Sequence, residues 1–274
     1  MFEKIIENVN RTTPLVHCIT NYVTVNDCAN VLLACGGSPI MADDNSEAEE
    51  ITTICKSLYI NIGTLNDRTI LSMLKAGRKA NALSHPVILD PVGAGASTLR
   101  TDTAFALLAN IRFSVIRGNI SEIRTLASGS GTTKGVDADI SDIVTEESLD
   151  EAVAFAKALS AHTHAVIVIT GEIDIVADSK KAFIIRNGHP MMRKVSGTGC
   201  MLTAVIAAFC GANQDNILDA AAAAVCMMGL SGELAHIRVT QNHAGISTYR
   251  TCIIDEIGKM DAGSLEKGAK IESR

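Results

Sequence analysis

Short apolar segments that alternate with helical patterns constrain the fold of this chain more than any other feature of its sequence. Six runs rich in aliphatic residues end at or beside glycine or a polar residue, and helical spacing follows each run. Continuous apolar runs of this kind are typical of parallel strands that helices cover on both faces. The predicted strands are residues 15–20, 39–42, 58–63, 86–90, 114–117 and 165–170.

Two further apolar runs lie on either side of the turn residues 178–180 and predict an antiparallel hairpin at the edge of the sheet. These two strands are residues 173–177 and 182–186. The predicted helices are residues 23–34, 47–57, 67–80, 102–110, 121–127, 148–160, 198–210, 216–237 and 244–259. The pattern predicts one three-layer α/β/α domain over residues 1–262, with a central, mostly parallel sheet, and a disordered tail over residues 263–274.

Composition and charge argue against several classes of partner. Hydrophobic residues make up 47% of the chain but aromatic residues only 3%, and the formal net charge is −6. Nucleic-acid binding uses clustered basic residues and aromatic stacking, so we exclude it. The eight cysteines form no C-x-x-C pair and do not predict zinc. The N-terminus lacks a secretory pattern and the longest apolar stretches are too short to span a membrane, so we expect a cytoplasmic protein without membrane contact.

Polar and charged residues follow several predicted strands, which is where ligands bind in an open parallel sheet. Asp90 ends one strand and precedes a glycine-containing loop, while Arg117 and Thr170 end two later strands. Glu122 lies in the first turn of the next helix, and the glycine-rich residues 196–200 open a long apolar helix. Carboxylates can bind Mg²⁺, arginine can bind phosphate oxygens, and helix amides can stabilise negative charge. This combination predicts a site for phosphoryl transfer.

Three other motifs do not have the spacing that their chemistry requires. Residues 129–135 resemble a phosphate-binding loop, but the lysine precedes the second glycine, so we expect only a mobile surface loop. Neither residues 93–95 nor residues 197–199 are completed by the third glycine of a dinucleotide fingerprint, which disfavours a nicotinamide dehydrogenase. Histidines 162, 164, 236 and 243 lack an H-E-x-x-H pattern and are predicted to be solvated or structural.

Five ordered segments resemble the hydroxyethylthiazole kinase family, a member of the ribokinase-like superfamily. They are PLVHCITN at 14–21, PIMA at 39–42, DPVGAG at 90–95, RGN at 117–119 followed by Glu122, and VSGTGC at 195–200. Several matches in the same order are far more specific than one glycine motif. The resemblance implies a ribokinase-like fold without a lid and ATP-dependent phosphorylation of the hydroxyethyl group of 4-methyl-5-(2-hydroxyethyl)thiazole, a step in thiamine biosynthesis and salvage.

The same resemblance implies roles in binding the two substrates. Arg117 and Thr170 would contact ATP, and Met41 and Gly197 would contact the thiazole alcohol. For Met41 there is also a purely structural interpretation, since a methionine at the end of a short apolar strand is well suited to a core.

The resemblance also implies that Asp90 and Glu122, the latter in an N-x-x-E pattern, hold Mg²⁺. Cys200 falls where most relatives in the superfamily have a catalytic Asp, so it would accept the proton of the alcohol. Helix amides stabilise negative charge, and the position therefore favours a partly ionised, reachable sulfur. The alternative is a thiol that only packs at the start of the helix.

The family resemblance implies a homotrimer in which neighbouring subunits complete the substrate pocket. The first predicted strand leads directly toward a helix, without an inserted strand lid, so a neighbouring subunit would have to exclude water from the site. Two other functions stay open from the residues. One is a lyase or hydratase on the same fold, and the other is a nucleotide-binding regulatory protein without turnover, against which the set Asp90, Glu122 and Cys200 argues.

Overall fold

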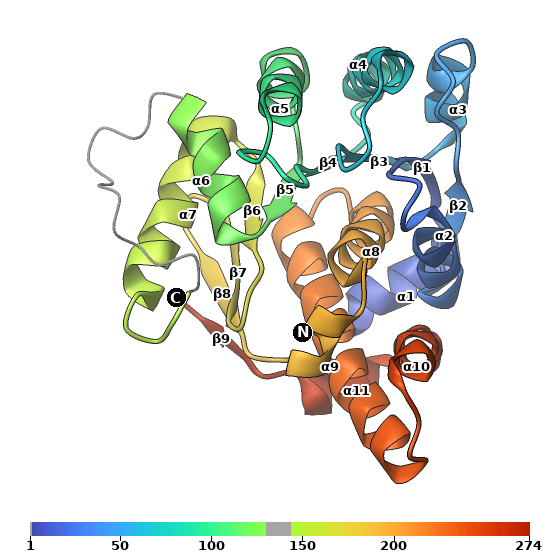
Figure 1. The fold of residues 1–274 in the computed structure, drawn as a ribbon, viewed down its shortest axis with the longest axis vertical. Helices are drawn as coiled ribbons and strands as arrows, with labels where there is room; N and C mark the ends of the chain where they lie inside the picture. Colours follow the sequence, from blue (N-terminus) through green and yellow to red (C-terminus); the bar gives the residue numbers. More distant parts are fainter. Residues whose placement is uncertain (1, 130–143) are drawn as a thin grey trace.

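One sheet contains all nine strands of the described part of the chain. The computed structural model describes residues 2–129 and 144–274, so nearly all of the loop predicted at 129–135 lies outside the described residues. The strand order is β2-β1-β3-β4-β5-β6-β7-β8-β9, parallel from β2 to β6 and antiparallel from β6 to β9 (Figure 1). The strands are β1 (Leu15–Ile19), β2 (Ser38–Ile40), β3 (Ser57–Asn61), β4 (Val87–Asp90), β5 (Val115–Gly118), β6 (Val166–Ile169), β7 (Asp174–Ala177), β8 (Ala182–Ile185) and β9 (Ile271–Ser273).

Helices cover both faces of the sheet and bury a separate apolar core on each side (Figure 1). One layer consists of α3 (Ala48–Ile54), α4 (Asp67–Ala82), α5 (Thr98–Asn110), α6 (Ile120–Gly129) and α7 (Leu149–Thr163). The other consists of α1 (Glu3–Thr12), α2 (Val25–Ala34), α8 (Thr198–Ala212), α9 (Ile217–Gln241), α10 (Ile246–Lys259) and α11 (Ala262–Gly268). This arrangement confirms the predicted three-layer α/β/α fold. Every described strand belongs to this sheet.

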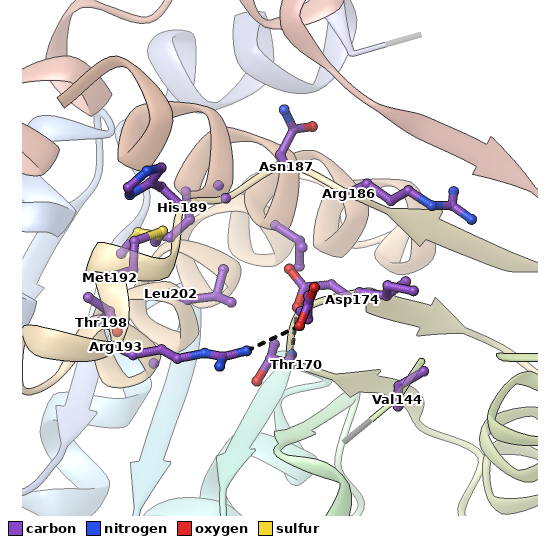
Figure 2. A pocket seen from close by; sticks show the side chains of 18 of the residues that line it. Val144, Thr170, Asp174, Arg186, Asn187, His189, Met192, Arg193, Thr198 and Leu202 are labelled. Carbon is purple, nitrogen blue, oxygen red and sulfur yellow. Dashed lines mark hydrogen bonds and ion pairs between the residues drawn. The ribbon is translucent and has the colours of Figure 1, made fainter. Parts of the chain in front are cut away.

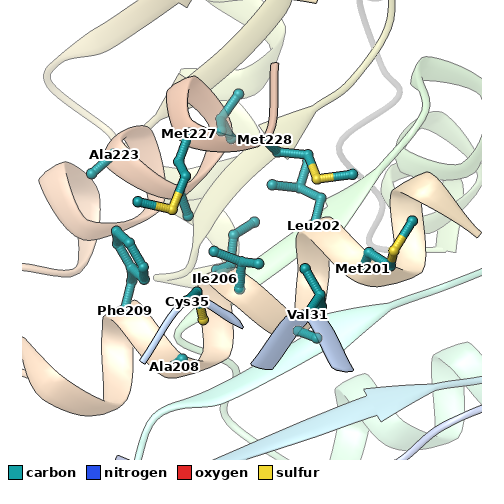
Figure 3. Close-up of a cluster of buried hydrophobic side chains, with 14 of the residues drawn as sticks. Val31, Cys35, Met201, Leu202, Ile206, Ala208, Phe209, Ala223, Met227 and Met228 are labelled. Atoms are coloured by element: carbon teal, nitrogen blue, oxygen red, sulfur yellow. The ribbon is translucent and has the colours of Figure 1, made fainter. Parts of the chain in front are cut away.

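Helices α8 and α9 pack together at the centre of one core because both are apolar on nearly every face. Ile206 and Phe209 of α8 lie in one cluster with Met227 of α9 and Cys35, which follows α2 (Figure 3). By length and composition α9 could cross a membrane, but 72% of its most apolar window is buried inside the protein. Its apolar sequence is therefore that of a core helix.

The C-terminal residues are folded, which corrects the prediction of a disordered tail over residues 263–274. Helix α11 is followed by β9, which pairs with β8 so that Ile271 lies opposite Ile185. An edge strand is held by backbone hydrogen bonds to one neighbouring strand. It therefore does not need alternating apolar residues, and the sequence carries no pattern that would predict it. The predicted β7–β8 hairpin is confirmed, but β9 forms the edge of the sheet.

Candidate active site

Four predicted site residues meet at the carboxyl ends of neighbouring strands. Asp90 ends β4, Arg117 lies on β5, Thr170 follows β6, and Glu122 lies in the first turn of α6. The Arg117 Nη1 atom lies 3.5 Å from Asp90 Oδ1, and Arg117 Nη2 donates a hydrogen bond to the Thr170 hydroxyl at 2.6 Å. The parallel register of β4, β5 and β6 explains why residues so far apart in sequence are neighbours.

The Asp90 carboxylate is fully buried and belongs to an internal polar network. Its Oδ2 accepts hydrogen bonds from Asn61 Nδ2 at 2.9 Å, from the Thr203 hydroxyl at 3.0 Å and from the Tyr59 hydroxyl at 3.4 Å. Burial raises the pKa of Asp90, although the positive charge of Arg117 opposes that change. Among the residues that the structure describes, Asp90 Oδ1 has no hydrogen-bond partner. This oxygen is therefore available to a cation or to water.

Glu122 connects the loop after β4 to the start of α6. Its Oε1 accepts a hydrogen bond from the Gly93 amide at 2.9 Å, and its Oε2 accepts one from the Asn119 amide at 2.9 Å. The Asn119 side chain accepts a hydrogen bond from the Glu122 amide at 2.8 Å, which completes a reciprocal capping arrangement. The glutamate thus fixes the loop that follows Asp90 as well as carrying charge.

The two carboxylates fit a magnesium ion whose other ligands come from outside the protein. Within residues 2–129 and 144–274, no group of three or more His, Cys, Asp or Glu side chains could hold a metal by itself. Mg²⁺ commonly takes one or two carboxylates and completes its coordination with water and phosphate. Asp90 Oδ1 is buried and accepts no hydrogen bond from the described residues, although Arg117 lies 3.5 Å away, and the negative charge of Glu122 raises the pKa of Asp90. The donor set therefore suits an ion that binds together with a phosphorylated ligand.

The start of α8 approaches its neighbours closely because glycine occupies two positions. Gly197 has a φ of 92°, and a Cβ there would lie 2.4 Å from Cγ2 of Thr24. A Cβ on Gly199 would lie 2.5 Å from Nη1 of Arg117. Glycine permits both the left-handed conformation and this packing. The first-turn amides of α8 consequently lie beside the Arg117 guanidinium, and together they favour an anion.

Cys200 is also in the first turn of α8, but it is only 8% exposed. Asn21 Nδ2 and Asn61 Nδ2 each lie 3.3 Å from its Sγ atom and donate hydrogen bonds to it. Burial raises the pKa of the thiol and nearby Asp90 raises it further, whereas hydrogen bonds with Thr24 and Asn21 lower it. The prediction of a partly ionised, reachable sulfur is therefore wrong, because burial outweighs the effect of the helix amides.

Asn21 and Asn61 are functional candidates that the sequence reasoning missed. Backbone donors fix the orientation of both amides, since Thr24 N donates to Asn21 Oδ1 at 3.1 Å and Gly63 N donates to Asn61 Oδ1 at 2.9 Å. Each Nδ2 group is consequently turned toward the sulfur of Cys200. Asn61 ends β3 and Asn21 lies two residues after β1. Both could have been predicted from the sequence, because polar residues at strand ends are candidates for a site.

Met41 lies on the far side of the site from Arg117. It follows β2, the first strand of the sheet, and is half-buried against the core that contains α8. The Nε2 atom of the buried His17 lies 2.8 Å from the carbonyl oxygen of the next residue, Ala42, which anchors this segment to β1. Strands β1, β3 and β4 separate β2 from β5. The predicted thiazole contact Met41 and the predicted ATP contact Arg117 therefore lie toward opposite ends of one sheet edge. The other predicted thiazole contact, Gly197, lies at the start of α8, two residues before Gly199 and its neighbour Arg117.

A cavity of ≈ 680 Å³ opens beside Arg117 and Thr170 (Figure 2). The short 3₁₀-helix η1 (Pro190–Lys194), the residues after β8 and the start of α8 form much of its lining. Leu202, Val225 and Met228 contribute apolar surface to it. A concave site of this size with an apolar part and a few polar groups is typical of small-molecule and cofactor binding.

Most charged side chains around the cavity are already paired. Arg186 forms hydrogen bonds of 2.9 and 3.1 Å with Glu146, and Arg193 Nη2 lies 3.8 Å from Glu172 Oε2. The terminal nitrogens of Arg117 are paired with Asp90 and Thr170, but its Nε is buried and has no hydrogen-bond partner within the described ranges. A buried donor of this kind beside helix amides points to an anionic ligand at this end of the cavity.

Comparisons with known proteins agree with this geometry. The family model for the hydroxyethylthiazole kinase family matches residues 6–263. A hydroxyethylthiazole kinase of Clostridium acetobutylicum is 59% identical over 273 residues, which cover 100% of both chains. The structure of a hydroxyethylthiazole kinase protein from Pyrococcus horikoshii OT3 has a TM-score of 0.88 at 31% identity and covers 100% of this chain and 98% of that one. A ribokinase-like superfamily protein from Enterococcus faecalis V583 shares the fold, with a TM-score of 0.58, 12% identity and coverage of 93% and 88%. Sequence and structure together show that this chain belongs to the hydroxyethylthiazole kinase family.

Proposed function

We propose that this protein is a cytoplasmic kinase that transfers the γ-phosphoryl group of ATP to the hydroxyethyl oxygen of 4-methyl-5-(2-hydroxyethyl)thiazole in thiamine biosynthesis. One observation carries the proposal: Arg117 packs directly over Gly199, and Cys200 follows in the same helical turn. The arginine and the helix amides can bind the phosphates of a nucleotide, and the cysteine can accept the proton of an alcohol. Family membership supports the substrate, since the relatives are named for it.

ATP would occupy the cavity of Figure 2 with its phosphates toward Arg117. The Thr170 hydroxyl holds one nitrogen of that guanidinium at 2.6 Å, so the charge is already oriented before the nucleotide arrives. When bound, Mg²⁺ would be held by Asp90 and Glu122 and would neutralise charge on phosphate oxygens. Because phosphoryl transfer needs little covalent help from the protein, this positioning would supply most of the rate enhancement.

The thiazole alcohol would contact Met41 and Gly197, with its hydroxyl directed toward Cys200. The oxygen of the alcohol forms the new bond to phosphorus while the bond to the ADP oxygen breaks, and the thiolate form of Cys200 takes the alcohol proton. The loose transition state lets this proton leave late, so an acceptor that is mostly protonated at neutral pH suffices. The amides of Asn21 and Asn61 donate to the sulfur and favour the thiolate that this step needs.

An assay for ADP release, combined with mass spectrometry of the product, tests this function. We expect ADP and thiazole phosphate in equal amounts, in a reaction that requires both the thiazole alcohol and Mg²⁺. ADP release without a phosphorylated thiazole would favour a lyase or hydratase that uses nucleotide energy differently. Nucleotide binding without any turnover would favour a regulatory protein. Either result would overturn the proposal.

We also infer that the active protein is a homotrimer in which a neighbouring subunit helps to close the site. Tyr22 and Val23, which follow Asn21 in the segment between β1 and α2, are 79% and 63% exposed. Large apolar side chains that protrude beside a site are typical of a protein interface. A subunit seated there would exclude water from the reacting groups, a role that a strand lid would otherwise have.

A further inference from the structure

A single carboxylate on α9, that of Glu233, contacts both the wall of the nucleotide cavity and the C-terminal segment. Its Oε1 accepts hydrogen bonds from the Gly188 amide at 2.9 Å and from Asn187 Nδ2 at 3.1 Å. Its Oε2 forms an ion pair of 2.8 Å with Lys270, in the connection from α11 to β9. Both Asn187 and Gly188 line the cavity. The carboxylate therefore connects a cavity wall to a segment distant in sequence.

Asn187 makes a second connection to the same segment, and its side chain is almost completely buried. One amide hydrogen goes to Glu233, and another goes to the carbonyl oxygen of Gly268 at 2.9 Å. Its Oδ1 accepts from the Lys270 amide at 2.7 Å, and this backbone donor fixes the orientation of the side chain. Both Nδ2 hydrogen bonds of Asn187 thus hold the cavity wall, one to Glu233 on α9 and one to residues 268–270.

The backbone at this wall adopts a conformation that depends on glycine. Gly188 has a φ of 137°, in a region that residues other than glycine rarely adopt. Helix α9 approaches so closely that a Cβ on Gly229 would lie 2.7 Å from the carbonyl oxygen of Asn187. The chain then enters η1, whose neighbour His189 and member Met192 also line the cavity (Figure 2). Contacts with α9 and the C-terminal segment therefore determine the shape of this wall.

We propose that Glu233, Asn187 and residues 268–270, here termed the C-terminal brace, position the wall of the cavity and thereby set the affinity for adenine nucleotide. This inference rests on the proposed function, because it assigns the cavity to ATP. Glu233 is a positioning residue in this view and acts through Asn187 and Gly188. The brace lies at the β8–β9 end of the sheet, whereas Met41 follows β2 at the other end. Loss of the brace should therefore weaken nucleotide binding and leave thiazole binding unchanged.

Titration calorimetry with ADP tests the brace without requiring turnover. Glu233→Ala removes the acceptor of the two hydrogen bonds from the cavity wall as well as the partner of Lys270, and should raise the Kd for ADP about tenfold or more. Glu233→Gln keeps an oxygen for the Gly188 amide and loses the ion pair, so it should restore much of the affinity. In steady-state kinetics, Glu233→Ala should raise the KM for ATP by a similar factor. The kcat at saturating ATP and the KM for the thiazole alcohol should stay within about twofold.

A matched pair of lysine variants provides a second measurement within the C-terminal segment. Lys270→Met breaks the ion pair with Glu233 and should raise the Kd for ADP about threefold, since the lysine is largely exposed. Lys267→Met, in the last turn of α11, removes the same charge without removing the ion pair between Lys270 and Glu233, and should leave the Kd unchanged.

The outcomes separate this inference from the proposed function. A folded Glu233→Ala variant with the ADP affinity of the wild type would contradict the proposed role of the brace. It would not contradict the proposed kinase function. If Glu233→Ala does not fold, equal ADP affinity for Lys270→Met and Lys267→Met would contradict the role of the brace instead. A wild-type protein that binds no ADP would overturn the proposed function, and the brace with it. A parallel loss of thiazole binding in Glu233→Ala would show a general structural defect and would also count against the brace.

Discussion

The groups around the Cys200 thiol shift its pKa in opposite directions. Burial and the neighbouring Asp90 raise its pKa, while Asn21 donates a hydrogen bond that stabilises the thiolate. The amide of Asn61 bonds both the sulfur and Asp90 Oδ2, so the proposed proton acceptor and a proposed magnesium ligand share one donor. A small change in this shared network is therefore expected to alter the chemistry at both residues.

Substitution of Cys200 tests its role as proton acceptor. Cys200→Ala should lower kcat about ten- to a thousandfold with little change in the KM for ATP, because the helix amides stay in place. Cys200→Asp should keep substantial activity, since a carboxylate can accept the proton and the hydrogen bonds of Asn21 and Asn61. If both variants are folded and equally inactive in the ADP-release assay, the thiol acts through its shape and not as a proton acceptor.

Glu122→Gln tests the proposed metal role with little change in side-chain volume. Loss of the charge should lower kcat more than about tenfold, and the lower activity should not recover fully at high Mg²⁺. One of the two backbone hydrogen bonds to the carboxylate is also lost, which should cost about 1 kcal/mol of stability. A kcat within about threefold of the wild type, measured on protein shown to be folded by circular dichroism, would contradict the metal role.

His17 predicts a dependence of stability on pH. Burial lowers its pKa below 6.5, so the unfolded chain binds a proton more readily than the folded protein does. The free energy of unfolding should therefore decrease as the pH falls below about 6.5 toward the lowered value. His17→Gln should show a smaller decrease in urea titrations at a series of pH values. An equal decrease in the free energy of unfolding of both proteins would show that another group causes it. His85 is one such group, because burial lowers its pKa as well.

At the scale of single elements, the start of α8 depends on the conformation of Gly197. Gly197→Ala would place a Cβ 2.4 Å from Thr24 in a residue with a φ of 92°. We expect it to cost about 2 kcal/mol or more, from backbone strain together with overpacking. Gly171→Ala is a suitable control, because its Cβ would lie 3.7 Å from the nearest atom. Thermal unfolding of the two variants should differ clearly, and equal melting temperatures would show that the start of α8 adapts without cost.

The helices differ in how much local sequence determines them. Predicted helices correspond to α2 through α10, and α4 begins with a complete capping box formed by Asn66 and Thr69. Helix α1 was not predicted, although Ile5, Ile6 and Val9 form its buried face. It is a short helix at the chain end, and packing against α8 and α11 contributes more to such a helix than propensity does.

At the scale of the whole molecule, the proposed trimer predicts that assembly and thiazole binding are lost together. Tyr22→Lys combined with Val23→Glu places charge in the exposed apolar segment and should convert the trimer to monomer in analytical ultracentrifugation. The monomer should still bind ADP but no longer bind the thiazole alcohol. Ile237→Lys, at a residue on α9 that is 52% exposed, serves as a control for surface charge. A wild-type monomer with full activity would contradict the trimer.

Local patterns were sufficient to predict the sheet and much of the site. Eight of the strands follow from apolar runs, because period and length are properties of neighbouring residues. Asp90, Arg117 and Thr170 could be placed together, since the carboxyl ends of parallel strands share one edge. For these features, the spacing of residues along the chain already determines their arrangement in space.

The tertiary structure decided what depends on burial and on contacts between distant segments. The raised pKa of the Cys200 thiol results from desolvation and from Asp90, neither of which appears in the helix-start motif that suggested ionisation. The C-terminal segment is folded because β9 pairs with β8 and Lys270 meets Glu233, although its own residues are polar and mostly exposed. Desolvation and long-range pairing depend on which residues the fold brings together, and local sequence patterns do not contain that information.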